Sequence, residues 1–342
     1  MADAPSRRPS LTRRASAVAK VARGVPGNLP VPNPFDRRTL ERAVAGKRVL
    51  ITGASAGIGE ALAGQVGAAG ATTLLVARTR EKLEAVAERI RADDGEAHVH
   101  PADLADLADL DRMADEVLDE HGGVDVLVNN AGRSIRRSIA LSYERMHDFQ
   151  RTIELNYYAP VKLILRFLPG MRERRSGHIV NVSTMGVQTN VPRFSAYVAS
   201  KAALDAFARS IASEVVEDRV AISTVYMPLV RTEMIAPTSH YRYFPALSPD
   251  EAAEMVADAI AKRQKKASTM LGRMSEVTYA TVPRVQDAFV NAGYKLFPDT
   301  RASKPKPEPG AAAAEAQDAA ADETEPSAEQ RAFSRLTRGV HW

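Results

Sequence analysis

The sequence predicts an α/β protein: a doubly wound Rossmann fold with a parallel, seven-stranded sheet, in a single domain with tails. From Lys47 to about Gly272, short runs rich in β-branched residues alternate with longer helical stretches. A glycine-rich turn follows the first of these runs directly. Strands that alternate with helices of this length form βαβ units, in which the strands lie parallel. The 342 residues, of which 45% are hydrophobic, are enough for one large α/β domain but too few for two such domains with tails.

Six short apolar runs have the composition of strands that are buried on both faces of a parallel sheet. In chain order they are Arg48–Thr52, Thr72–Ala77, Ala97–His100, Asp125–Val128, His178–Val182 and Val220–Tyr226. Four stretches have helical periodicity: Thr79–Ala92, Asp106–Glu120, Asp250 to about Lys266, and the amphipathic stretch Met274–Phe297. Acidic residues open the third of these, where the positive end of the helix dipole stabilises them.

Composition and charge divide the chain into five predicted parts. Residues 1–46 form a basic N-terminal arm and residues 47–272 the Rossmann catalytic domain. A C-terminal helical extension spans 273–301, an acidic linker 302–330, and a basic-aromatic tail 331–342. The linker is rich in Ala, Pro and Glu and has almost no large apolar residue, so burial would not offset its ordering entropy. We therefore expect it to be disordered.

Composition also excludes several classes of protein. The sequence has no cysteine, which excludes disulfides and thiolate chemistry. It has no run of about 18 apolar residues that would span a membrane, and its basic N-terminus lacks the apolar core of a secretory signal. A net charge of +4 is small for this length and predicts no nucleic-acid partner. We expect a cytoplasmic protein whose basic arm is either solvated or in peripheral contact with anionic lipid at the inner face of the membrane.

The turn after the first predicted strand has the composition of a phosphate-binding loop. It comprises Thr52, Gly53, Ala54, Ser55, Ala56, Gly57, Ile58 and Gly59. Glycines at a strand-to-helix turn let the backbone approach a pyrophosphate, and the helix N-terminus supplies free N–H groups. A glycine-rich turn alone also occurs as an ordinary tight turn. On the first strand of an alternating pattern, it predicts a dinucleotide site.

The end of the second predicted strand indicates which dinucleotide binds. An acidic residue there accepts hydrogen bonds from the ribose 2′-hydroxyl of NAD. This sequence instead has Arg78, with Arg80 and Lys82 nearby. An arginine can hold the 2′-phosphate of NADP with charge-assisted hydrogen bonds. The predicted cofactor is therefore NADPH or NADP, the alternative being that Arg78 is a solvated residue at a helix start.

A tyrosine and a lysine are spaced for joint proton transfer. Tyr197 and Lys201 are four residues apart, so both lie on one face of a predicted helix. A phenol with an ordinary pKa near ~10 exchanges protons poorly at neutral pH, and a neighbouring ammonium lowers that pKa. Ser183 follows a buried predicted strand, where its hydroxyl can polarise a carbonyl. The spacing alone is common by chance, and its alternative is a helix with one aromatic and one charged residue.

Taken in order, these motifs resemble the short-chain dehydrogenase/reductase family. The resemblance covers Lys47 to about Gly272 and rests on the glycine turn, Asp103-Leu104, Asn129-Asn130-Ala131-Gly132, Asn156, Ser183, and Tyr197 with Lys201. It implies an oxidoreductase that is a homo-oligomer, in which helices around residues 153–171 and 197–213 pair across a two-fold axis.

The resemblance also implies a role for each motif residue. Tyr197 is the general acid/base, Lys201 lowers its pKa and binds the nicotinamide ribose, and Ser183 holds the substrate carbonyl. Asn156 orders a water in a proton relay. The implied cofactor contacts are those of Gly53, Ser55, Ala56, Gly57, Ile58, Gly59, Arg78, Asp103, Leu104, Asn130, Ala131, Gly132, Tyr197, Lys201, Pro228, Val230 and Thr232. The family's Pro-Gly motif has Leu229 in place of glycine here, so this loop departs from the family pattern.

Two features near the predicted site bear on the substrate. Arg133, Arg136 and Arg137 would form a cationic rim, and the apolar and aromatic residues of 234–247 would form a lid. Together they suit a long acyl chain on a phosphorylated handle such as coenzyme A. A solvated arginine face and an ordinary packed loop are the alternative. The stretches 129–138, 177–183 and 338–342 resemble the actinobacterial fatty acyl-CoA reductase-like branch of the family.

The predicted function is therefore the NADPH-dependent reduction of a lipophilic carbonyl, in the first place of a fatty acyl-CoA to the aldehyde. The alternatives are a long-chain or steroid-like alcohol dehydrogenase or ketoreductase, and a non-catalytic NADP-binding scaffold. The complete set of Asn156, Ser183, Tyr197 and Lys201 argues against the scaffold. No metal site is predicted, because His98 and His100 point the same way from one strand but no third ligand is evident.

Overall fold

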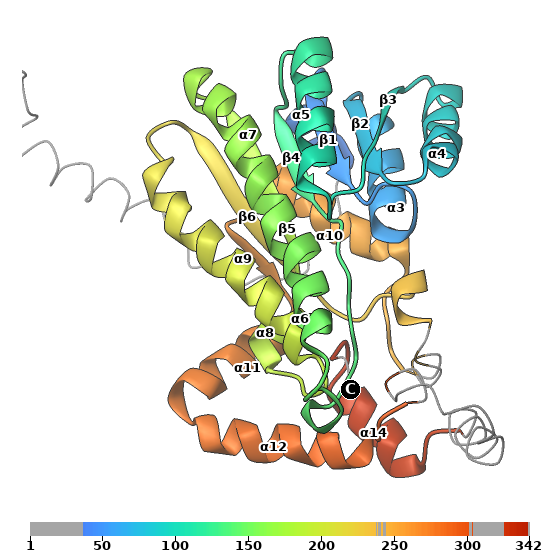
Figure 1. Cartoon of the computed structure of the whole chain (residues 1–342), viewed down its shortest axis with the longest axis vertical. Helices are drawn as coiled ribbons and strands as arrows, with labels where there is room; N and C mark the ends of the chain where they lie inside the picture. The colour runs from blue at the N-terminus through green and yellow to red at the C-terminus, as the bar shows by residue number, and fades with distance from the viewer. Residues whose placement is uncertain are drawn as a thin grey trace, which may run out of the picture. The chain divides into compact units, whose positions relative to one another are not determined.

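The computed structural model describes residues 37–236, 238, 241, 244–300, 303 and 325–340. Most of the predicted basic arm and acidic linker lie outside these residues, as do His341 and Trp342 of the predicted tail. The described residues form a parallel sheet with helices packed against it (Figure 1). This arrangement confirms the predicted doubly wound Rossmann fold with seven parallel strands.

The sheet has the strand order β3-β2-β1-β4-β5-β6-β7. Its strands are β1 (Arg48–Thr52), β2 (Thr72–Ala77), β3 (Glu96–Pro101), β4 (Val126–Asn129), β5 (Gly177–Thr184), β6 (Val220–Met227) and β7 (Lys266–Ser268). All six strands predicted individually are present. The strand order reverses between β1 and β4, and in open α/β sheets the crevice beyond the carboxyl ends of the strands at such a point binds ligands.

Helices pack on both faces of this sheet. They are α2 (Arg37–Val44), α3 (Gly57–Gly67), α4 (Arg80–Ala92), α5 (Leu107–His121), α6 (Met146–Ile153), α7 (Ala159–Glu173), α8 (Gly186–Thr189), α9 (Ser195–Glu214), α10 (Pro249–Lys262), α11 (Met270–Thr281), α12 (Pro283–Leu296) and α14 (Ala328–Leu336). Short 3-10 turns cover Ile139–Leu141 and Glu233–Ile235, and a π-helical turn covers Glu154–Tyr158. Apolar residues of α5, α7 and α9 form one core with Leu50, Leu74 and Leu127 of the strands. Figure 1 shows α7 in front of the sheet and α10, which contacts α2 and α3, behind it.

Two predicted helices end differently from the prediction. The helix expected to run from Asp250 to Lys266 ends at Lys262, because Arg263 adopts a left-handed conformation with φ of 48°. The next residues form β7, which pairs with β6. The stretch Met274–Phe297 is two helices, since Pro283 cannot donate a helical hydrogen bond and moves Val282 out of the helical region.

The C-terminal helices pack beside the carboxyl ends of β5 and β6. Phe297 and Val340 join an apolar cluster with Tyr197, Leu229 and Phe244. Figure 1 places α11, α12 and α14 together at this end of the sheet. The last of them, α14, begins within the range predicted as linker, where the side chains of Ser327 and Gln330 form a capping box.

Candidate active site

A cavity of about 240 Å³ lies at the carboxyl ends of the central strands, where the strand order reverses. It brings together thirteen of the predicted site residues: Gly53, Ala56, Gly57, Ile58, Asn130, Ala131, Gly132, Ser183, Tyr197, Lys201, Pro228, Val230 and Thr232. Predicted residues that do not line it are Ser55, Gly59, Arg78, Asp103, Leu104 and Asn156. The cavity is therefore where segments far apart in the sequence meet.

The glycine turn has a backbone that other residues would not allow. Gly53 and Gly57 have φ values of 67° and 60°, in the left-handed region that favours glycine. A Cβ on Gly59 would lie 2.2 Å from the carbonyl oxygen of Gly53. The side-chain amide of Asn130 donates to the Thr52 carbonyl at 2.9 Å, which links the turn to the end of β4. The turn is thus held open beside the N-terminus of α3.

Tyr197 and Lys201 lie on α9, one turn apart, and both are buried. The ammonium of Lys201 donates to the Val182 carbonyl at 2.8 Å. Ser183, at the end of β5, is 3% exposed, and its hydroxyl has no hydrogen-bond partner among the described residues. A buried hydroxyl without a partner carries a cost in free energy, so a carbonyl oxygen in the cavity would be a favourable partner for it.

Asn156 lies just behind the cavity, in the π-helical turn between α6 and α7. Its amide nitrogen donates to the carbonyl of Arg133 and to the hydroxyl of Ser200, both at 2.9 Å. Its amide oxygen accepts from the backbone nitrogen of Arg133 at 2.8 Å. A Cβ on Gly132 would lie 3.2 Å from that oxygen and 3.3 Å from the Lys201 nitrogen. Glycine at this position therefore lets Asn156 approach the lysine.

Burial dominates the electrostatics of the two titratable groups. Burial raises the pKa of Tyr197 to about 12, although a hydrogen bond with Thr184 acts against the rise. Burial lowers the pKa of Lys201 to about 8. Desolvation of the phenol is thus the largest effect on its pKa in this structure, and the predicted lowering of that pKa by Lys201 stays a prediction. Thr184 is a site residue that was not predicted from the sequence.

A group of cations lies near the end of β2. Burial, and then the charges of Arg151 and Arg78, lower the pKa of Arg133, while Asp103 acts in the opposite direction. Arg78 itself is exposed. The backbone of Asp103 donates to the carboxylate of Asp109 at 2.7 Å. The positive charges of Arg78 and Arg133 are thus close enough to repel each other, and both lie near the loop that carries Asp103.

Arg136 and Arg137, two residues of the predicted cationic rim, are engaged in contacts within the protein. Arg137 pairs with Asp148 at 2.9 Å, with side chains only 10% and 5% exposed, and it also donates to the carbonyl of Ser303. Arg136 donates to the carbonyl of Pro298 at 2.9 Å and hydrogen-bonds Tyr241. Their guanidinium groups thus contact the C-terminal extension and α6, and a role of both in binding phosphate stays a prediction.

A second cavity of about 210 Å³ adjoins the first, since Met234 and Ile235 line both. Its wall also includes Ile135, Phe194 and Tyr241. Several of these residues belong to the stretch predicted as a lid, of which Pro237, His240 and Tyr243 lie outside the described residues. Arg136 and Arg137 also line this second cavity, so its wall combines apolar and basic side chains.

The C-terminal segment completes the loop that departs from the family pattern. The backbone nitrogen of Leu229 donates to the carbonyl of Gly339 at 2.9 Å, and Leu229 is fully buried. Gly339 has a φ of 87°, and a Cβ there would lie 2.8 Å from the Cβ of Pro228. This contact was not predicted. Its one signal in the sequence was the glycine in the short basic-aromatic tail.

None of the described helices is long and apolar enough to cross a membrane.

Similarity to known proteins extends over most of this chain. The family model for short chain dehydrogenase matches residues 47–242. An uncharacterized oxidoreductase of Mycobacterium tuberculosis is 51% identical over 308 residues, 89% of this chain and 87% of that protein. A fatty acyl-CoA reductase of Acinetobacter baylyi is 46% identical over 299 residues, 87% of this chain and 96% of that protein. A solved metagenomic short-chain oxidoreductase in complex with NADP is 32% identical, with a TM-score of 0.56, over 66% of this chain and 100% of that one.

Proposed function

Because this chain belongs to the short-chain dehydrogenase/reductase family of oxidoreductases, we propose that it reduces a fatty acyl-CoA thioester to the fatty aldehyde with NADPH. The observation that carries this proposal is the buried hydroxyl of Ser183, which has no partner among the described residues and lines the first cavity together with Tyr197. The names of the relatives support the acyl-CoA substrate, since one of them is a fatty acyl-CoA reductase.

The residues present fit a bound NADPH. The open glycine turn and the N-terminus of α3 would hold the pyrophosphate. Arg78 and Arg133 would hold the 2′-phosphate, with Asp103 and Leu104 at the adenine. Lys201 would bind the nicotinamide ribose, and Val230 and Thr232 would contact the carboxamide. Asn130, Ala131 and Gly132 would lie along the cofactor between these ends.

The catalytic work of the chain is to hold the carbonyl and to supply a proton. Ser183 donates a hydrogen bond to the carbonyl oxygen, and Tyr197 transfers its phenolic proton to that oxygen as the bond is reduced. Lys201, once its amine is charged, stabilises the phenolate that remains. Asn156 positions the proton relay behind them. The bound NADPH supplies the hydride that the carbonyl carbon accepts.

The thioester reaction balances without any further reactant. One acyl-CoA, one NADPH and one proton give one aldehyde, one coenzyme A thiol and one NADP. After hydride addition, the oxygen returns its proton to Tyr197 as the carbonyl re-forms, the carbon–sulfur bond breaks, and the proton taken up ends on the sulfur. The second cavity, beyond Met234 and Ile235, would take the acyl chain.

One observation favours a second candidate, an alcohol dehydrogenase or ketoreductase for a long-chain or steroid-like carbonyl. Arg136 and Arg137 are engaged within the protein, with Pro298 and Asp148, so the phosphates of coenzyme A would have to compete with these contacts. A substrate without phosphates would meet no such competition. The two cavities suit it equally well.

Thiol release separates the two candidates. The purified protein is given NADPH with a long-chain acyl-CoA, or with an aldehyde or ketone of equal length, and both NADPH loss and free thiol are followed. Because the chain has no cysteine, a thiol reagent sees only released coenzyme A. We expect one thiol for each NADPH consumed, and aldehyde as the product. Consumption with the free carbonyl compounds alone, without thiol, would establish the second candidate instead.

Two variants tie the activity to the site. Tyr197→Phe removes only the buried hydroxyl, and Tyr143→Phe removes one from a side chain that is 79% exposed. The first variant should lose turnover and the second should retain it.

A further inference from the structure

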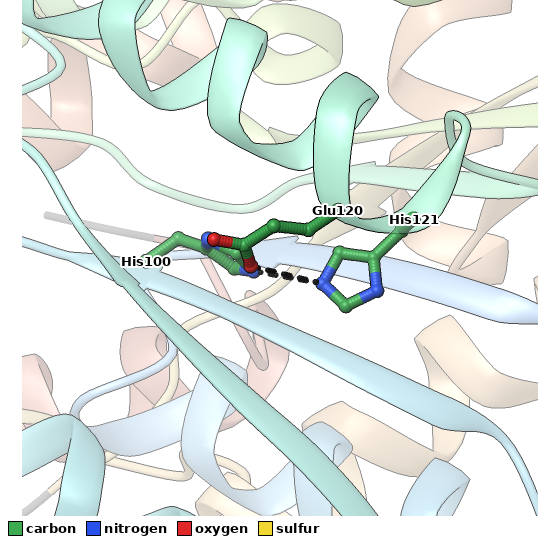
Figure 2. A group of neighbouring side chains, drawn as sticks. All are labelled: His100, Glu120 and His121. Carbon is green, nitrogen blue, oxygen red and sulfur yellow. Dashed lines mark hydrogen bonds and ion pairs between the residues drawn. The ribbon is translucent and has the colours of Figure 1, made fainter.

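Three potential metal ligands converge at the outer edge of the sheet, away from the cavity. They are His100 on β3 and the adjacent Glu120 and His121 at the end of α5, and their ligand atoms all lie within 4.8 Å of one another. Figure 2 shows the His121 ring directed at the His100 ring, with the Glu120 carboxylate beside it. None of the three lines either cavity described above. The sequence offered only His98 and His100 as a pair, whereas the structure brings His100 together with Glu120 and with His121, which is 21 residues further along the chain.

The spacing of the two imidazoles matches that of metal ligands. The Nε2 atoms of His100 and His121 lie 3.2 Å apart. Bonds of about 2.0–2.1 Å to a tetrahedral zinc ion place neighbouring ligand atoms roughly 3.3–3.4 Å apart. A carboxylate oxygen of Glu120 lies 3.7 Å from the Nε2 atom of His121, so a small rotation of that exposed side chain reaches the third corner. Water would take the fourth corner.

The two histidines are held in this arrangement by the surrounding structure. His100 is 3% exposed, and the side chain of His121 is 11% exposed. Arg48, which is ion-paired with Asp125, donates to the backbone carbonyl of His121 at 2.6 Å. The ring of His98 packs edge-on against His121 with ring centroids 4.7 Å apart. Little reorganisation would therefore be needed to receive an ion.

We propose that His100, His121 and Glu120 bind a single divalent cation of the zinc class, which ties the edge strand β3 to the end of α5. Two imidazoles and one carboxylate suit zinc and its neighbours in the first transition row, whereas calcium and magnesium prefer oxygen ligands alone. The occupant that competes with the metal is a proton shared between the two Nε2 atoms in a simple hydrogen bond. The ion lies outside the reduction site, so its role is to stabilise the fold.

Zinc titration of the full chain tests this proposal. The protein is purified without a histidine tag, treated with a chelator and titrated with zinc chloride in a calorimeter, and the bound metal is counted by native mass spectrometry. We expect one zinc per chain with micromolar or tighter affinity, and no uptake of magnesium or calcium. The thermal midpoint should rise when zinc is added.

Matched variants assign the binding to these residues. His121→Gln should weaken zinc binding at least about tenfold, because even outer-shell changes have effects of that size. His147→Gln removes an imidazole that is 47% exposed and lies beside Asp148, and it should bind as the wild type does. Glu120→Gln, at a side chain that is 60% exposed, should also weaken binding and serves as the test if His121→Gln fails to fold. Absence of stoichiometric zinc in the wild type, or equal affinity in all variants, would overturn the proposal in favour of the shared proton.

Discussion

The ion pair between Arg137 and Asp148 allows a direct test of what the arginine cluster does. Arg137 Nε lies 2.9 Å from a carboxylate oxygen of Asp148, and the same arginine donates to the carbonyl of Ser303 in the C-terminal extension. Both side chains are almost fully buried. Arg137→Ala would leave a buried carboxylate with Arg145, at 3.2 Å, as its remaining close arginine partner.

The expected loss of stability follows from this geometry. Removing one partner of a buried pair costs about 3–5 kcal/mol, because the other charge is left without compensation. Arg145 offsets part of that cost, so we expect a loss of roughly 2–3 kcal/mol. For a domain of this size each kcal/mol lowers the thermal midpoint by about 2–4 °C, which gives a fall of roughly 4–12 °C.

The difference in stability between the wild type and Arg137→Ala should depend on pH, and this dependence gives a second measure of the ion pair. Burial acts to raise the pKa of Asp148, but hydrogen bonds from Arg145 and Arg137 outweigh it and hold the pKa below its ordinary value of 3.8. A lowered carboxyl pKa stabilises the fold above the unfolded-state pKa, and this stabilisation is lost as the pH falls through the folded-state pKa. The wild type and Arg137→Ala should therefore differ most near neutral pH and converge below about pH 4.

Thermal unfolding followed by circular dichroism, together with steady-state kinetics, distinguishes the two roles of Arg137. Arg145→Ala is the matched control, since it removes the more exposed arginine from the same carboxylate and should cost less. If Arg137→Ala unfolds at the wild-type temperature and instead raises KM for acyl-CoA alone, the arginine binds the substrate's phosphates and the structural interpretation is refuted.

Four further predictions concern the reaction, the cofactor, the C-terminal segment and assembly. Tyr197→Phe should abolish turnover while NADPH still binds, as followed by cofactor fluorescence; a rate near that of the wild type would contradict its role as acid/base. The wild type should prefer NADPH to NADH, and Arg78→Asp should erase or reverse the preference in kcat/KM, because a carboxylate repels the 2′-phosphate; equal use of both cofactors by the wild type would contradict the assignment. Gly339→Ala should reduce kcat/KM and lower the thermal midpoint, because its Cβ would lie 2.8 Å from Pro228 at a φ of 87°; unchanged kinetics would show that the segment does not support the Pro228 loop. The protein should sediment as a homo-oligomer at micromolar concentration, and a monomer alone would count against the family's two-fold pairing.

The strands and the cofactor turn could be predicted because their signals are local. A run rich in β-branched residues, such as Val49 and Ile51, is apolar whatever surrounds it, and a parallel sheet needs that property on both faces. The turn at Gly53 and Gly57 needs positive φ values, and glycine meets that need within a few residues of sequence. The spacing of Tyr197 and Lys201 likewise depends on nothing beyond one helical turn.

The partners of the arginine cluster could not be predicted, because a sequence does not show which group pairs with a charge. Arg136 and Arg137 follow the cofactor motif directly, yet their partners include Pro298 and Ser303, which are more than 160 residues away. The effect of burial on Tyr197 could not be predicted for a related reason. Spacing showed the neighbouring lysine, but only the packed structure shows how completely the phenol is removed from water, and that desolvation decides the direction of its pKa.

The sequence by itself determined the fold, the dinucleotide turn and the identities of the candidate catalytic residues, because each depends on residue type and short-range spacing. The tertiary structure alone decided which side chains meet across large separations. It joined Gly339 to Leu229, formed a second cavity lined in part by Met234, and brought His121 to within 3.2 Å of His100. Such contacts depend on how helices and loops pack on the sheet, and packing is a property of the whole chain that no local pattern contains.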